Sequence, residues 1–204
     1  MKTIILSTRI IIDQYKKISF QIDEDLSNFI NYLNLQFLPI GLKKNKLMLD
    51  NIKKADGLIL AGGGDLFKHH KDKSNLIRDN YEKKLFNYFL KKNKPILTIC
   101  RGFQLIAQLN KIKLHKINHH VKKNHLLYLK KSKYINYKSL TVNSYHNYCV
   151  KELPNEYINI SNTKDGSIEI AEHKYKKILC LMFHPERPMK SQQQILKSIK
   201  KFFK

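Results

Sequence analysis

The chain has 204 residues, 42% of them hydrophobic, which is enough for one domain with a buried core and excludes a disordered or fibrous chain. Lysine and arginine outnumber aspartate and glutamate by 39 to 16, but only four of the 39 are arginine, so the net charge of +23 indicates compositional drift more than nucleic-acid binding. No apolar run reaches the roughly 20 residues of a membrane span, and Arg9 interrupts the apolar start where a signal peptide would continue, so we expect a cytoplasmic domain over residues 1–204.

Eight segments are predicted to be strands. In chain order they are residues 2–12, 36–40, 57–61, 95–100, 139–142, 157–160, 167–173 and 178–183. Several are continuous apolar runs, which are typical of strands buried on both faces of a parallel sheet. Residues 111–138 are rich in lysine and histidine and lack a clear period, so surface loops and short strands are predicted there.

Helical periodicity lies between these strands. Its apolar positions are Leu26, Phe29, Ile30 and Leu33 in a first helix, Tyr81, Leu85, Tyr88 and Phe89 in a second, and Ile195, Ile199 and Phe202 in a third. The acidic residues 23–25 come directly before the first helix, where the helix dipole favours negative charge. Strands that alternate with helices predict a three-layer α/β domain with right-handed crossovers.

Three unusual segments follow predicted strands, at the sheet edge where ligands bind in such folds. The first is Ala-Gly-Gly-Gly-Asp at residues 61–65, after the strand 57–61. A glycine triplet lets the backbone approach a ligand closely and turn N–H groups toward it, although such runs also form ordinary tight turns.

The second segment places Cys100 between an apolar strand and the start of a further helix, whose apolar positions begin at Phe103. A nucleophile on such a turn is exposed at the top of the sheet, and the helix N-terminus lowers the thiol pKa from about 8.5. Taken alone, the same pattern also fits a small apolar cysteine that ends a buried strand.

The third segment is Phe-His-Pro-Glu at residues 183–186, which ends another apolar strand. A cysteine nucleophile needs a base to take its proton, and that base needs a carboxylate to hold its tautomer. Cys100, His184 and Glu186 supply these three chemical types. Cys149 and Cys180 are poorer candidates for the nucleophile because neither begins a helix.

The other cysteines and histidines predict neither a disulfide framework nor a metal site. The three cysteines are an odd number without C-x-x-C spacing. The pairs at residues 69–70 and 119–120 lack the spacing and companion ligands of a zinc site, so we expect solvated loop histidines and no bound metal.

Five motifs occur in one order along the chain: Gly-Gly-Gly-Asp at 62–65, Ile-Cys-Arg-Gly-Phe-Gln at 99–104, Val-Asn-Ser-Tyr-His-Asn at 142–147, Asp-Gly-Ser-Ile-Glu at 165–169 and Phe-His-Pro-Glu at 183–186. Together they resemble the class I glutamine amidotransferase superfamily, and within it most closely the γ-glutamyl hydrolases of the peptidase C26 type. Arg78-Asp79-x-x-Glu82 and Asn-Ser-x-His favour this hydrolase branch over the amidotransferases that serve a synthetase. The resemblance implies a flavodoxin-like αβα fold with a mostly parallel central sheet.

The resemblance also implies a role for each matching residue. Cys100 would be the nucleophile, His184 the general acid and base, and Glu186 the group that orients His184, while the backbone N–H groups of Gly63 and Arg101 would form an oxyanion hole. The residues expected to bind the glutamyl group are Gly62, Gln104, Asn143, Ser144, Tyr145 and His146. A γ-glutamyl thioester would form and then be hydrolysed, with no metal or cofactor.

The amine half of the substrate is expected to be anionic, with a phosphorylated group as the leading case. Arg9, Arg78 and Arg101 could line the mouth of the site and hold such a group. A small branch of the family hydrolyses γ-glutamyl-CDP-amidate during synthesis of capsule phosphoramidate, and this nucleotide-linked compound is the leading specific candidate. The alternative interpretation is that Arg78 and Asp79 only cap and pair at a helix start.

Other functions stay open at the level of sequence. One alternative is a γ-glutamyl-GABA-type hydrolase, and another is a glutaminase subunit that delivers ammonia to a synthetase partner. A third is a non-enzymatic module that binds polyanions, which rests on the net charge alone and predicts steeply salt-dependent DNA binding. The favoured partner is a small γ-glutamyl compound, with no nucleic acid and no membrane, and the oligomeric state is left open.

Overall fold

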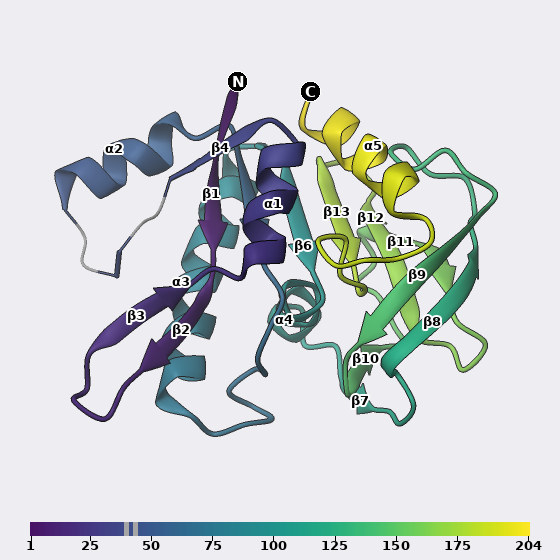
Figure 1. The fold of residues 1–204 in the computed structure, drawn as a ribbon, viewed down its shortest axis with the longest axis horizontal. Helices are drawn as coiled ribbons and strands as arrows, with labels where there is room; N and C mark the ends of the chain where they lie inside the picture. Colours follow the sequence, from purple (N-terminus) through teal and green to yellow (C-terminus); the bar gives the residue numbers. More distant parts are fainter. Residues whose placement is uncertain (39–40, 43–44) are drawn as a thin grey trace.

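The computed structural model describes residues 1–38, 41–42 and 45–204, and within them seven strands form a central sheet (Figure 1). These strands are β1 (Lys2–Ser7), β4 (Leu35–Leu38), β5 (Gly57–Leu60), β6 (Ile96–Ile99), β11 (Tyr157–Asn162), β12 (Ile168–His173) and β13 (Ile178–Leu181). Their order across the sheet is β11-β12-β13-β6-β5-β1-β4. The five strands from β13 to β4 are parallel, whereas β12 runs antiparallel to both of its neighbours. The predicted mostly parallel sheet is therefore confirmed.

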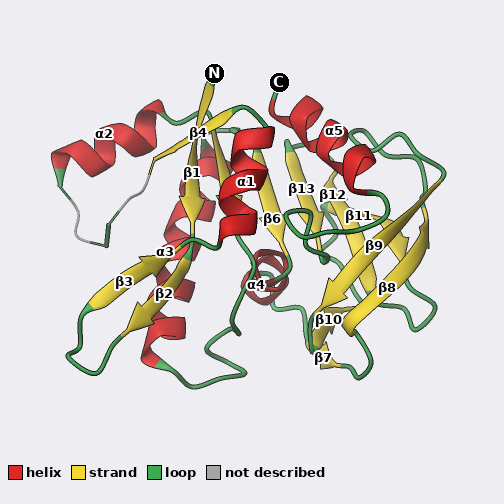
Figure 2. Ribbon diagram, viewed as in Figure 1, coloured by secondary structure: helices red, strands yellow, loops and turns green. Residues whose placement is uncertain are grey.

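Helices cover both faces of this sheet (Figure 2). On one face, α1 (Glu24–Tyr32) and α5 (Gln192–Phe203) pack their buried apolar side chains against the sheet. On the other face lie α2 (Lys46–Lys54), α3 (Lys73–Lys91) and α4 (Arg101–Leu109). The three-layer prediction is confirmed, and α2 is an addition to it. Among the described residues, no helix combines the length and hydropathy that crossing a membrane requires.

The predicted strand at residues 2–12 is in fact two strands. After β1, the chain leaves the sheet, and β2 (Arg9–Ile12) pairs antiparallel with β3 (Ile18–Gln21) in a hairpin that extends from the sheet edge (Figure 1). The apolar pattern runs through the break because Ile10 is buried where this hairpin meets the rest of the protein. Residues 39–40 of the predicted strand 36–40 lie outside the described residues.

A small antiparallel region stands beside β11 and β12. It contains β8 (Val121–Tyr128) paired with β9 (Ser139–Tyr145), and β7 (Leu114–Lys116) paired with β10 (Tyr148–Val150). The prediction of loops and short strands at 111–138 is thus only partly right, since β8 has eight residues. Most of β8 is exposed, so its sequence carries little of the apolar alternation by which strands are recognised.

The topology brings the three motif segments together. β5, β6 and β13 are neighbours in the sheet and point the same way, so their carboxyl ends lie at one edge. The glycine triplet follows β5, Cys100 follows β6, and His184 comes three residues after β13. The candidate site lies at this edge, as expected for a sheet of this kind.

Candidate active site

Cys100 occupies the turn between β6 and the first residue of α4. Its backbone has φ 46° and ψ −99°, a combination that residues other than glycine rarely adopt. Its N–H donates to the carbonyl of Leu181 in β13, and its carbonyl accepts from the N–H groups of Phe103 and Gln104. Because α4 starts at the next residue, the sulfur lies at a helix N-terminus. Cys100 is only 6% exposed, so the expectation of an exposed residue at this turn is wrong. Strain held by surrounding structure at a strand-to-helix turn is typical of a nucleophile elbow.

His184 lies between Cys100 and Glu186. Its Nδ1 is 2.6 Å from Oε1 of Glu186, so the ring nitrogen left for the Cys100 sulfur is Nε2. Burial by itself lowers the pKa of His184, but the charge and hydrogen bond of Cys100, followed by those of Glu186, raise it to about 10. The imidazole is therefore favoured in its protonated form, which places a proton donor beside the sulfur of Cys100.

Two residues of β9 hold His184 in place. Asn143 accepts a hydrogen bond from the His184 N–H at 2.9 Å, and its side-chain amide donates to the His184 carbonyl at 2.8 Å. The ring of Tyr145 meets the His184 ring edge-on, with centroids 5.8 Å apart. The guanidinium of Arg187 lies over the Tyr145 ring, 4.7 Å from its centroid. Arg187 is the one arginine for which no role was predicted from the sequence.

Gly62 approaches the reactive pair so closely that no side chain fits there. A Cβ at this position would lie 2.6 Å from Cε1 of His184 and 3.5 Å from Cβ of Cys100. Contacts below 3.0 Å require one group to move, and the imidazole is held on two sides. The need for glycine here is therefore steric.

Arg78 holds the backbone carbonyls of the glycine loop. Its guanidinium donates to the carbonyls of Ala61, Gly62 and Gly63 at 2.8, 3.1 and 2.6 Å. In a trans peptide the C=O and the next N–H point in opposite directions, so binding the Gly62 carbonyl turns the Gly63 N–H away from Arg78. This orientation suits the proposed use of that N–H as an oxyanion donor. The other proposed donor, the Arg101 N–H, is one of the first N–H groups of α4, which have no acceptor within the helix.

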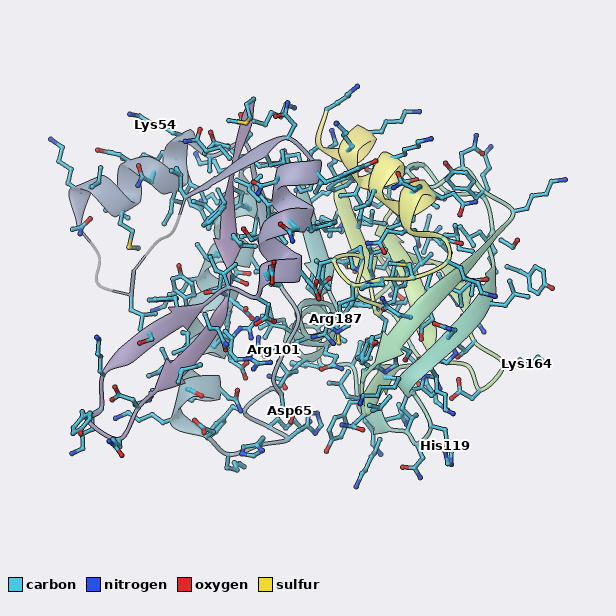
Figure 3. All side chains as sticks on the ribbon, in the orientation of Figure 1. Lys54, Asp65, Arg101, His119, Lys164 and Arg187 are labelled. Carbon is cyan, nitrogen blue, oxygen red and sulfur yellow. The ribbon has the colours of Figure 1, made fainter. Side chains whose placement is uncertain are left out.

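Arg78 and Arg101 do not line the mouth of the site, so that expectation is wrong for their side chains. They are 2% and 0% exposed, respectively. Both guanidiniums bind Glu82, and Arg101 also binds Asp79. Arg78 does not open a helix either, because α3 begins five residues earlier at Lys73. Figure 3 shows Arg101 close to Asp65, whose carbonyl accepts a hydrogen bond from it.

Arg9 differs from those two arginines because it is exposed. The position of a Cβ on Gly63 would be 2.9 Å from Nη2 of Arg9, so its guanidinium lies over the glycine loop. It borders a groove of about 420 Å³ that also contains Asp65, His70 and Asp72. Of the three arginines expected at the mouth of the site, Arg9 is therefore the exposed one, and it borders this groove.

Residues 143–146 do not all face the same side, so the expectation that all four grip the substrate needs correction. Side chains alternate along a strand, and Asn143 and Tyr145 face His184. Ser144 is fully buried and donates to the carbonyl of His120, and His146 contacts Glu169 on the far side of β9. Both lie away from Cys100.

The side chain of Gln104 is already engaged in a hydrogen bond within the protein. Its side-chain amide nitrogen donates to the carbonyl of Tyr148 at 2.9 Å, and the residue is 4% exposed. This bond ties α4 to β10. A role of Gln104 in glutamyl binding stays a prediction that rests on its amide oxygen.

Removal of the Cys100 sulfur should lower the pKa of His184. In Cys100→Ala, the two largest contributions that raise this pKa disappear, while burial, which lowers it, is unchanged. We expect His184 to stay protonated at pH 8 in the wild-type protein and to lose its proton at a lower pH in the variant. Histidine ¹H–¹³C NMR titration, with His184→Gln to assign the signal, would measure this. The same titration curve in both proteins would contradict the effect of Cys100 on the pKa of His184.

Comparisons with known proteins agree with this architecture. The family model described as Peptidase C26 matches residues 35–186. The chain is 31% identical to a γ-glutamyl-CDP-amidate hydrolase of Campylobacter jejuni subsp. jejuni serotype O:2, over 76% of this chain and 74% of that protein. It is 26% identical to the imidazole glycerol phosphate synthase subunit HisH of Blochmanniella pennsylvanica, over 84% of this chain and 94% of that protein. Among solved structures, a Thermoplasma acidophilum protein assigned as part of a GMP synthase superposes with a TM-score of 0.75 at 20% identity, covering 100% of this chain and 94% of that one.

Proposed function

The chain belongs to the Peptidase C26 family, and from that premise we propose that it hydrolyses a γ-glutamyl amide bond with Cys100 as nucleophile. The observation that carries this proposal is the position of His184, whose Nδ1 is 2.6 Å from Glu186 and whose pKa is raised most by the neighbouring Cys100. Because the carboxylate holds Nδ1, Nε2 is the ring nitrogen that can exchange a proton with the sulfur. This is the order of groups that cysteine-based acyl transfer requires.

The reaction would proceed in two steps. The Cys100 thiolate attacks the γ-carbonyl carbon, and as the C–N bond breaks, the His184 imidazolium gives its proton to the departing nitrogen. Water then attacks the γ-glutamyl thioester, His184 takes a proton from it, and glutamate leaves as the thiolate forms again. Glu186 keeps the imidazole in the tautomer and orientation that both proton transfers need.

The negative oxygen that forms in each step would be stabilised by the backbone N–H groups of Gly63 and Arg101. Removing one such donor costs roughly 3 kcal/mol of transition-state stabilisation in known enzymes. Arg78 supports this role because it fixes the carbonyls of the glycine loop. In this proposal Arg78 is a positioning residue that does not touch the substrate.

The leading substrate is γ-glutamyl-CDP-amidate, with cytidine diphosphoramidate as the second product. Similarity to the Campylobacter hydrolase supports it, and so does the exposed guanidinium of Arg9 above the glycine loop. Two carboxylates, Asp65 and Asp72, border the same groove, so recognition of a diphosphate would depend on Arg9. A place in capsule phosphoramidate synthesis and a cytoplasmic location accompany this substrate as predictions.

The proposed substrate can be tested by the release of glutamate from γ-glutamyl-CDP-amidate, γ-glutamyl-GABA and glutamine. We expect the CDP-linked compound to have the highest kcat/KM, and Arg9→Gln to raise its KM about tenfold while changing kcat/KM for glutamine less than twofold. Lys17→Gln, which removes an exposed cation of the β2–β3 turn outside the groove, is the matched control.

Equal rates on all three compounds would overturn the anionic amine half but not γ-glutamyl hydrolysis. A rate highest on glutamine would favour the alternative that the chain supplies ammonia to a synthetase, which similarity to the Blochmanniella HisH protein supports. No glutamate from any compound, with folded protein, would contradict the proposed hydrolysis itself.

A further inference from the structure

A second group of ionisable side chains lies on the face of β9 that points away from His184. It consists of His120 just before β8, His146 just after β9, and Glu169 in β12. One nitrogen of each histidine and one oxygen of the carboxylate all lie within 4.8 Å of one another. All three side chains are buried, so the expectation that the 119–120 pair is solvated is wrong for His120. Burial of such groups without partners costs free energy.

Several atoms of this cluster have no hydrogen-bond partner within the part of the chain that the structure describes. These buried atoms are Nδ1 of His120, Nε2 of His146, Oε2 of Glu169 and Nε2 of the neighbouring His125 in β8. The ring centroid of His120 is 4.5 Å from that of His125 and 5.0 Å from that of His146. His120, His146 and Glu169 therefore meet at one place with His125 beside His120, and each of the four has an atom without a hydrogen bond.

The opposite atoms of these side chains are held. Nε2 of His120 is 2.9 Å from the Asp165 carboxylate, and Nδ1 of His146 is 3.1 Å from the carbonyl of Tyr148. These acceptors place the proton on Nε2 of His120 and on Nδ1 of His146. The other nitrogen of each ring keeps its lone pair and points into the cluster. Oε1 of Glu169 accepts from Ser167 at 3.2 Å. A histidine bonded through its outer nitrogen to a carboxylate or a backbone carbonyl is the usual arrangement around a metal ligand.

We propose that His120, His146 and Glu169, with His125 as a fourth ligand, bind a divalent transition-metal ion, preferentially Zn²⁺. Imidazole nitrogen and carboxylate oxygen are ligands of Zn²⁺ at about 2.0–2.2 Å, which separates neighbouring ligand atoms by roughly 3.3–3.5 Å in a tetrahedral site. The carboxylate of Glu169 is already at this range from His146, since its Oε1 is 3.5 Å from Nε2 of His146, and its Oε2 is the oxygen without a hydrogen bond. A proton shared between His146 and Glu169 would give a hydrogen bond to those two side chains only. One metal ion can be bound by all four side chains.

The surroundings give such an ion access and a structural role. A groove of about 550 Å³ is bordered by His120, His125 and residues 163–165, so the cluster is close to solvent. In Figure 3, His119 and Lys164 lie at this end of the protein, beside the β8–β9 pair and far from the labelled Arg101. An ion bound here would tie β8 and the end of β9 to β12 of the central sheet. Because Tyr145 precedes His146, this tie would also steady the tyrosine that packs on His184.

The proposed ion can be tested by metal binding alone, without any assay of turnover. Untagged protein treated with EDTA and then with Zn²⁺ should bind one equivalent by native mass spectrometry, and its Tm should rise by about 5 °C or more. Co²⁺ should give visible absorption bands typical of tetrahedral nitrogen and oxygen coordination. His146→Gln and Glu169→Gln should each weaken Zn²⁺ binding more than tenfold, and Asp165→Asn should weaken it about tenfold or more.

Two controls separate this cluster from other metal-binding groups. Cys100→Ser removes the thiol that could bind Zn²⁺ together with His184, and this variant should still bind one equivalent of Zn²⁺. His119→Asn changes the exposed neighbour of His120 to a residue that tolerates its φ of 65°, and it should bind Zn²⁺ as the wild type does. Lack of Zn²⁺ binding by the wild-type protein at micromolar concentration would overturn the proposal. The proposal would also be overturned if Cys100→Ser lost Zn²⁺ binding and His146→Gln kept it.

Discussion

Replacement of Cys100 by alanine should abolish γ-glutamyl hydrolysis, with a loss in kcat of roughly 10⁴-fold or more. The variant has no group that can form the thioester, and His184 also loses the partner that keeps it protonated. Alanine adopts the same positive φ as cysteine at no greater cost, and the substitution removes only one heavy atom, so the fold should persist. Release of glutamate measures the activity, and circular dichroism measures Tm, which should change by no more than about 3 °C.

The other two cysteines provide matched controls for this variant. Cys149 and Cys180 are fully buried in strands, and burial raises the pKa of both thiols. Cys149→Ala and Cys180→Ala should therefore keep turnover within about threefold of wild type. Glu186→Gln should keep more activity than Cys100→Ala, because orientation of His184 is only part of the effect. Measurable turnover in a folded Cys100→Ala protein would contradict the assignment of the nucleophile.

The sheet could be predicted because its central strands have no exposed face. Every residue of β5, β6 and β13 is buried, so continuous apolar runs mark them in the sequence. Elements outside the sheet lack this signal. β3 is exposed throughout and α2 buries only Ile52 of its nine residues, and neither was predicted. Tertiary contacts, more than local pattern, determine such elements.

The location of Cys100 and His184 at one edge of the sheet could be predicted because each follows a recognisable strand, whereas the burial of the arginines could not. Composition shows that arginine is rare, but it does not show which guanidinium is buried. The spacing of four residues between Arg78 and Glu82 was a usable signal, because such residues are neighbours on a helix. The position of Arg101 opposite them depends on how α4 packs on α3, which no local pattern gives.

The buried ion cluster explains why these arginines are needed away from the substrate. Glu82 is bound by Arg78, by Arg101 and by the hydroxyl of Ser7 at the end of β1. Ser7 in turn accepts a hydrogen bond from the N–H of Ala61 at the end of β5. One carboxylate thus links two strand ends, α3 and α4, directly beneath the glycine loop and the nucleophile turn. The positions of the proposed oxyanion donors, the N–H groups of Gly63 and Arg101, would depend on this carboxylate.

Glu82→Gln should therefore destabilise the protein by about 3–5 kcal/mol, because it leaves two buried guanidiniums without their shared anion. Burial and the nearby Arg101 lower the pKa of Arg78 to about 10, so its guanidinium stays charged at neutral pH. The amide nitrogen of glutamine would also face guanidinium donors. Urea unfolding at pH 7 measures the free energy of unfolding. We also expect kcat/KM of the folded variant to fall at least tenfold, as the glycine loop loses its support.

The pH dependence and an exposed control distinguish this cluster effect from general damage. Burial raises the pKa of Glu82, but Arg101 and Arg78 lower it more, so the folded pKa lies below the ordinary 4.5. The stabilisation is therefore present above pH 4.5 and lost as the pH falls through the folded pKa, and the gap between wild type and Glu82→Gln should narrow in acid. Asp50→Asn, which breaks the exposed pair with Lys53, should change stability by less than about 0.5 kcal/mol. If Glu82→Gln behaved like Asp50→Asn, the cluster would not be what positions the glycine loop.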